Sequence, residues 1–145
     1  MEYRDFITPN DDDVISSKDY LSIQNAIQKA KETGCNKVVV PRFNKRNQSF
    51  LWEIESSLKL PSDIWIILDN CHLKMADNTI CNMITNENCR TPEGNTQEGT
   101  QRNIIIEGRG RAVLDVANTT DFPKETTKTL TVPFPWITAR LCFLM

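Results

Sequence analysis

The most regular hydrophobic pattern lies near the start of the chain, where apolar residues recur at steps of three and four. They are Tyr20, Ile23, Ile27 and Ala30. This spacing places them on one face of a helix. Ser16 and Asp19 have capping-box spacing, and Gly34 suits a left-handed helix end. The pattern predicts a helix over roughly residues 17–33, whose apolar face must pack against another apolar surface.

Beyond Gly34 the pattern changes to that of extended chain. Short apolar runs, many of them rich in β-branched residues, alternate with polar turns and predict strands. We place these strands at residues 37–40, 50–54, 57–60, 64–69, 71–75, 82–84, 103–107 and 112–115. The hydrophilic stretch 85–101 predicts a long loop. No second helix intervenes between the strands, which argues against a doubly wound α/β sheet.

Two of these strand groups resemble each other. Residues 66–69 followed by 73–75 are similar to residues 104–107 followed by 113–114. Ile84 lies between the groups and suggests a repeat of about 20 residues. Short strands that cannot bury their own faces, repeated at this period, favour a β-solenoid. A β-sandwich or barrel remains the alternative.

Composition adds limits rather than a function. The chain has 145 residues, with 17 basic and 19 acidic side chains and a net charge of -2, so neither nucleic acid nor an anionic membrane is an expected partner. No apolar stretch approaches the roughly 20 residues of a membrane span. Residues 1–15 are polar and acidic and do not resemble a secretory signal. We expect a soluble protein, and its compartment stays open.

Several motifs resemble the start of the pectin lyase-like superfamily. They are Asp19-x-x-Ser22-Ile23-Gln24-Asn25-Ala26-Ile27, Gly34-x-x-Lys37-Val38-Val39-Val40-Pro41, the segment Ile54 to Asp63 with its Leu-Pro-Ser turn, and residues 69–77 and 103–115. The bacterial polygalacturonase-like glycoside hydrolases are the most similar group. The resemblance implies a mostly β protein, a right-handed parallel β-helix that begins with an N-terminal capping α-helix.

The resemblance also suggests how the chain is divided. Residues 1–36 would be an irregular N-terminal segment and the capping helix, residues 37–117 the first coils, and residues 118–145 a divergent tail. The tail is rich in threonine and proline and shows no coil period. Codons allowed for residues 136–145, read one base earlier, can spell a coil-like strand, so a frameshift is our hypothesis for it. An incomplete solenoid would expose its last coil and self-associate there.

Family members cleave glycosidic bonds with aspartates on middle coils, and the strings Asn-Thr-Asp, Gly-His-Gly and Arg-x-Lys are absent here. We therefore expect a scaffold fragment of a polysaccharide-active protein, inactive alone, whose full-length form would hydrolyse pectin-like polymers. A non-catalytic solenoid for glycan binding or for phage or surface attachment is one alternative. An inactive product of a truncated gene is another. We assign no catalytic, cofactor or metal residue.

Other candidate residues have structural interpretations that compete with functional ones. Asp69 and Asp115 end two strands and would lie about 10 Å apart if two coils separate them, just beyond the spacing of an inverting pair. Turn capping is the competing interpretation. Gly108-Arg109-Gly110-Arg111 predicts a tight turn rather than a phosphate loop, because an extended run follows it. His72 is expected to be a half-buried structural residue. Trp52 and Trp65 predict packing, with sugar stacking as the alternative.

The five cysteines are Cys35, Cys71, Cys81, Cys89 and Cys142. None are spaced as close zinc-ligand pairs, so we expect buried free thiols rather than a metal site. A disulfide is the second interpretation.

Overall fold

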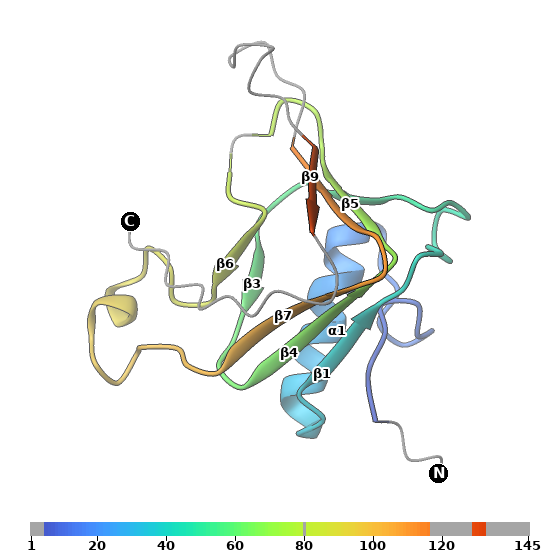
Figure 1. The fold of residues 1–145 in the computed structure, drawn as a ribbon. Helices are drawn as coiled ribbons and strands as arrows, with labels where there is room; N and C mark the ends of the chain where they lie inside the picture. The colour runs from blue at the N-terminus through green and yellow to red at the C-terminus, as the bar shows by residue number, and fades with distance from the viewer. Residues whose placement is uncertain (1–4, 80, 117–128, 133–145) are drawn as a thin grey trace.

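The computed structural model describes residues 5–79, 81–116 and 129–132. It is mostly β, with one α-helix and parallel strands in sheets (Figure 1). In chain order the elements are α1 Asp19–Thr33, β1 Lys37–Val40, β2 Trp52–Ile54, β3 Leu58–Leu60, β4 Ile64–Asp69, β5 His72–Met75, β6 Ile84–Asn86, the short 3-10 helix η1 Pro92–Asn95, β7 Ile104–Arg109, β8 Ala112–Asp115 and β9 Thr129–Val132. The predicted helix and strands are therefore confirmed apart from shifts at their ends, the largest at β6, which shares only Ile84 with the predicted strand 82–84 and includes residues 85 and 86 of the predicted loop.

Helix α1 forms as predicted, but its start differs from the expected capping box. The helix begins after Lys18, which makes no side-chain cap. Instead, Ser16 N donates to Ser22 Oγ at 2.9 Å, and the Asp19 carboxylate turns away from the helix to accept from Arg46 Nε at 2.6 Å. Gly34 ends the helix in the left-handed region at φ 73°, as expected.

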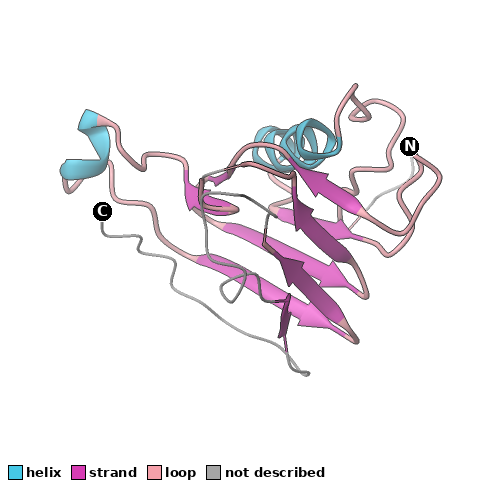
Figure 2. Ribbon diagram, turned by 90° about the horizontal axis from the view of Figure 1, so that it is seen from above, coloured by secondary structure: helices cyan, strands magenta, loops and turns pink. Residues whose placement is uncertain are grey.

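The strands form three sheets that each receive one strand per pass of the chain. The first has the order β1-β4-β7, the second β2-β5-β8 and the third β3-β6, and all these pairs are parallel. The buried face of α1 contacts the three strands of the first pass. Figure 2 shows the helix at one end of the stacked strands. This arrangement fits the start of a parallel β-helix.

The spacing between stacked strands corrects the predicted repeat. Trp65 pairs with Lys37 on one side and Ile105 on the other, which lie 28 residues before it and 40 after it. Ile84 belongs to β6 and pairs with Leu58, in a different sheet from Ile105. The uniform repeat of about 20 residues is therefore wrong. The predicted repeat assigned β6 to the same sheet as β4, as the next strand in the stack. In the structure β6 instead belongs to the same pass of the chain as β4.

The sharp corners between strands stack as well. Asn70 between β4 and β5 and Gly110 between β7 and β8 both have positive φ, 51° and 61°. Asn70 Oδ1 accepts from Arg111 N at 3.0 Å, and Asn70 N donates to Arg109 O at 2.9 Å. The predicted turn at residues 108–111 is confirmed at Gly110, although its first two residues belong to β7.

The core lies inside the three sheets and is filled by alternate residues of each strand. The buried side chains include Ile23, Ile27, Val38, Val40, Trp52, Ile54, Leu58, Leu60, Ile64, Ile66, Leu68 and Leu73. Because side chains alternate along a strand, the residues between them face outwards. Trp52 is fully buried, and its Nε1 donates to Pro41 O at 2.8 Å. Packing is therefore confirmed for Trp52, and the sugar-stacking alternative for this residue is wrong.

Part of the predicted divergent tail joins the second sheet. Strand β9 pairs antiparallel with β8, with Leu114 opposite Leu130, so this sheet departs from the parallel pattern at its edge. The rest of residues 118–145 lies outside the described residues. Among the described strands, β7 forms the edge of the first sheet. Self-association through the last coil stays a prediction.

Candidate functional site

The outer face of the β1-β4-β7 sheet carries an unusual set of side chains. By strand alternation, Lys37 and Val39 of β1 face outwards, as do Trp65, Ile67 and Asp69 of β4 and Ile105, Glu107 and Arg109 of β7. The strand register places each outward-facing residue beside one of the neighbouring pass. Asp69 lies opposite Arg109, for example, and Ile67 lies opposite Glu107.

An open cleft of about 760 Å³ runs over this face. It is lined by Asp5, Phe6, Thr8, Asp11, Lys37, Val39, Asp69 and Arg109. The first four belong to the N-terminal segment, which is held beside β1 because Ile7 N donates to Lys37 O and Val39 N donates to Ile7 O, both at 2.9 Å. The volume falls in the range of about 300–1,000 Å³ that is typical of small-molecule sites.

A polar network crosses the three strands beneath the cleft. Lys37 Nζ lies 4.8 Å from the centroid of the Trp65 ring, and Trp65 Nε1 donates to Glu107 Oε2 at 2.9 Å. Arg109 Nε in turn lies 3.3 Å from Glu107 Oε1. Glu107 is only 9% exposed, so its charge is neutralised by these donors rather than by water. The bond to Glu107 holds the Trp65 ring in place, and Lys37 lies over one face of that ring.

The two cationic groups of the cleft differ in whether a carboxylate neutralises their charge. Arg109 is paired with Glu107, whereas Lys37 makes no ion pair with a carboxylate in the part of the chain that the structure describes. Asp69, which lies beside Arg109 in register, supplies an acceptor to the cleft, and its Oδ1 accepts from Asn70 Nδ2 at 3.1 Å. The lining therefore offers two cationic groups, Lys37 and Arg109, beside three carboxylates, Asp5, Asp11 and Asp69, so it can meet both an anionic group and hydroxyls. The positively charged groups would meet the anion, and Asp69 would accept from a hydroxyl.

Asp69 and Asp115 do not stack in one sheet. Asp69 ends β4 in the first sheet, and Asp115 ends β8 in the second. They lie in successive passes but in different sheets, so the expectation of a stacked pair two coils apart is wrong. Asp69 Oδ1 accepts from the Asn70 side chain rather than from a backbone N–H, so turn capping by Asp69 stays a prediction.

Asp115 instead pairs with the chain's one histidine. His72 Nε2 lies 3.0 Å from Asp115 Oδ2, and the two side chains are 38% and 22% exposed. The half-buried position of His72 is confirmed. Its partner was not predicted, because the two residues are 43 positions apart and meet only through the pairing of β5 with β8. The pair links two successive passes on the outer face of the second sheet.

The described cysteines occupy different environments. Cys71 is buried, and burial raises the pKa of its thiol to about 12. Cys35 and Cys89 are half-buried and Cys81 is exposed, so buried thiols are confirmed only in part. Cys142 lies outside the described residues. Within residues 5–79, 81–116 and 129–132, no group of three or more His, Cys, Asp or Glu side chains is placed to hold a metal ion.

In comparisons with protein families, curated proteins and solved structures, no family model, protein or structure matches this chain. No helix in the described part of the chain has the length and apolar character needed to cross a membrane.

Proposed function

We propose that this chain forms the opening coils of a right-handed parallel β-helix in a polysaccharide-active protein, whose full-length form hydrolyses glycosidic bonds in pectin-like acidic polymers. The observation that carries the proposal is the order of the sheets. Three successive strands of the first pass each pair in parallel with the corresponding strand of the second pass, and two of them continue into a third. With α1 packed against the first pass, this order agrees with the resemblance to the pectin lyase-like superfamily.

The cleft over the first sheet supports an acidic glycan as the ligand. Lys37 and Arg109 line the cleft and can pair with carboxylates, while Thr8 and the carboxylates of Asp5, Asp11 and Asp69 can bond with hydroxyls. The cleft extends from the N-terminal segment across strands from all three passes, so it follows the direction in which coils stack. A polymer lying along the stack would therefore present successive sugar units to it.

A non-catalytic glycan-binding module is the second candidate, and one observation favours it. In the described residues, Asp69 and Asp115 lie in different sheets, and Asp115 is bonded to His72. The two carboxylates therefore do not stack in one sheet. Under either candidate, this chain by itself binds glycan without cleaving it.

A binding and cleavage assay tests the proposal. We expect oligogalacturonate to bind the purified chain and no reducing ends to appear from polygalacturonate. Replacing Lys37 or Arg109 by glutamine should weaken binding by about tenfold, because each change removes a charge-assisted contact. Lys59→Gln is the matched control, since Lys59 is exposed on β3 away from the cleft. Equal affinities for all four proteins would contradict the cleft, and released reducing ends would contradict the scaffold role.

A further inference from the structure

A second feature of the surface stands apart from the cleft lining. The segment 42–51, which we call the aromatic hairpin, follows β1 and exposes Phe43 by 41% and Phe50 by 57%. Their ring centroids lie 5.9 Å apart at an interplanar angle of 65°, and Arg42 Cζ lies 4.7 Å from the centroid of the Phe50 ring. Single exposed apolar residues are ordinary, but two contacting rings with a stacked guanidinium form a patch that needs an explanation.

The aromatic hairpin is held firmly in place. Asn44 N donates to Ser49 O at 2.8 Å, and the fully buried Asn44 side chain donates to Leu51 O at 3.0 Å. Arg46 reaches down to the carboxylate of Asp19, which is 2% exposed. The rings are therefore exposed on a fixed support, so a ligand would bind without first having to order the loop.

The charges of the aromatic hairpin are also unevenly compensated. Lys45 is paired with Asp12 and Arg46 with Asp19. Arg42 makes no ion pair with any carboxylate in the described ranges, and its contact is the Phe50 ring. An aromatic surface beside an uncompensated guanidinium suits a ligand with one flat apolar face and one anionic group.

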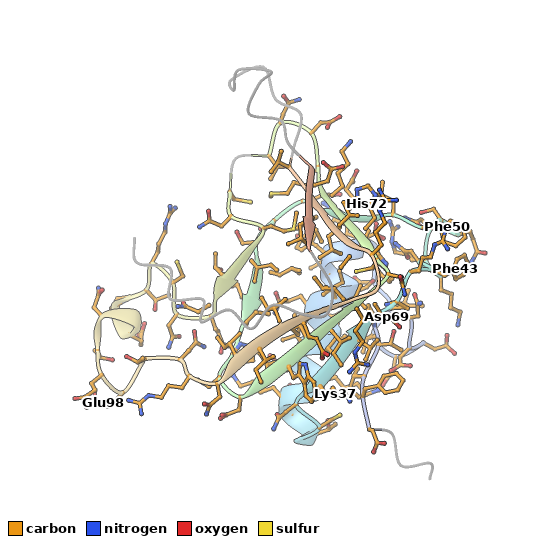
Figure 3. All side chains as sticks on the ribbon, viewed as in Figure 1. Lys37, Phe43, Phe50, Asp69, His72 and Glu98 are labelled. Carbon is orange, nitrogen blue, oxygen red and sulfur yellow. The ribbon has the colours of Figure 1, made fainter. Side chains whose placement is uncertain are left out.

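The aromatic hairpin adjoins the cleft. Asn10 Nδ2 donates to Phe43 O at 2.8 Å, and Lys45 N donates to Asn10 Oδ1 at 2.9 Å. Asp11, the residue after Asn10, lines the cleft. Val40, the last residue of β1, pairs with Leu68, so the hairpin leaves the sheet at the edge where Asp69 lies. Figure 3 draws Phe43 and Phe50 together on the side of the molecule where Asp69 and Lys37 also lie.

We propose that the aromatic hairpin is a second glycan-binding site, which takes one uronate unit of the same polymer that lies in the cleft. The C–H face of the sugar ring packs on Phe50, Phe43 supports the Phe50 ring at an interplanar angle of 65°, and the carboxylate accepts hydrogen bonds from Arg42. The inference rests on the proposed function, because the acidic glycan comes from there. The site anchors the polymer beside the cleft and takes no part in bond cleavage.

The test compares variants of the purified chain by calorimetric titration with a galacturonate hexamer. Phe50→Ala and Phe43→Ala should each weaken binding by about tenfold, and Phe50→Tyr should retain it because an aromatic ring remains. Arg42→Gln should weaken binding of the free acid but leave binding of the methyl-esterified hexamer unchanged, since the ester carries no charge. Val116→Ala and Arg102→Gln are controls, because both residues are exposed elsewhere on the surface. Circular dichroism melting verifies that each variant is folded.

The outcomes separate this inference from the proposed function. If the Lys37 and Arg109 variants lose affinity and the hairpin variants do not, the hairpin site is wrong and the cleft stands. If the hairpin rings bind anionic vesicles or single-stranded DNA and not galacturonate, the chosen partner is wrong. If the wild-type chain does not bind galacturonate at all, both glycan sites are wrong, and the coil architecture is tested separately by its strand register.

Discussion

At the scale of single residues, the corners of the fold are set by a small group with left-handed backbone. Asn36, Asp63 and Asn103 directly precede the strands of the first sheet, and their φ values lie between 58° and 59°. Asparagine and aspartate tolerate this region because their short side chains bond locally. Asn103 Nδ2 also donates to Asp63 Oδ1 at 2.8 Å, so one corner supports the next. These polar interruptions therefore direct the chain from strand to strand.

The corner at Gly110 predicts a strong effect of adding a side chain. A Cβ there would overlap the Asn70 carboxamide, and φ is 61°. We expect Gly110→Ala to lower the free energy of unfolding by about 2–4 kcal/mol, as measured by chemical denaturation.

Gly34→Ala is the matched control for Gly110→Ala. Gly34 has a similar φ of 73° but open space where its Cβ would lie. Gly34→Ala should therefore lower the free energy of unfolding only by the cost of a left-handed alanine, about 1 kcal/mol. Equal losses of stability in the two variants would contradict the steric argument at Gly110.

Buried Cys71 predicts a pH dependence of stability. Burial raises the pKa of its thiol from the ordinary value of 9.0 to about 12. Between these values the unfolded chain loses a proton that the folded chain keeps, so stability is full below pH 9 and falls as pH rises. At pH 10 the free energy of unfolding should be about 1 kcal/mol lower than at pH 8. Chemical denaturation of wild type and Cys71→Ala at both pH values measures this, because only the wild type carries the thiol. A pH-independent difference would contradict the burial of this thiol.

At the scale of elements, the sequence predicts the local structure well and the connections between passes poorly. The 3,4-spacing along α1 and the alternation in Val38 and Val40 are local, so they could be read directly. The 40-residue step from Trp65 to Ile105 could not be predicted in this way. Residues 87–103 form a loop between the strands, and the hydrophobic pattern does not show how much this loop lengthens the repeat. The contacts within the candidate site could not be predicted for the same reason. Trp65 meets Glu107 only once the register is known.

The long loop between β6 and β7 predicts a region that can be shortened. Its base is closed by Asn88 Nδ2, which donates to Gly99 O at 2.6 Å, and by Asn88 N, which donates to Gln101 Oε1 at 3.0 Å. Deleting residues 90–97 should change the free energy of unfolding by less than about 1 kcal/mol, because loop length has a weak effect on closure.

Asn88→Ala provides the contrast for this deletion. It removes the carboxamide bond to Gly99 O that closes the loop base, and should destabilise the protein by about 1 kcal/mol in the same denaturation series. A deletion that abolished cooperative unfolding would show that the loop tip belongs to the core.

At the scale of the whole molecule, the three sheets share one core that α1 covers at one end. Each pass contacts mainly its neighbours, as in repeat architectures whose stability is a sum of local interfaces. The cleft is lined in part by residues of β1, β4 and β7, and the aromatic hairpin follows β1, so the first sheet supports both proposed glycan sites. The proposed binding groups of the cleft therefore depend on the parallel register of the first sheet.

Nuclear Overhauser measurements between backbone protons of β4 and β7 test this register most directly. We predict parallel contacts in which Trp65 lies beside Ile105 and Ile67 beside Glu107, together with Leu73 beside Leu114. A β-sandwich would instead pair strands that are adjacent in the chain, such as β4 and β5, in antiparallel order. Antiparallel contacts between β4 and β5, without those joining β4 to β7, would contradict the account.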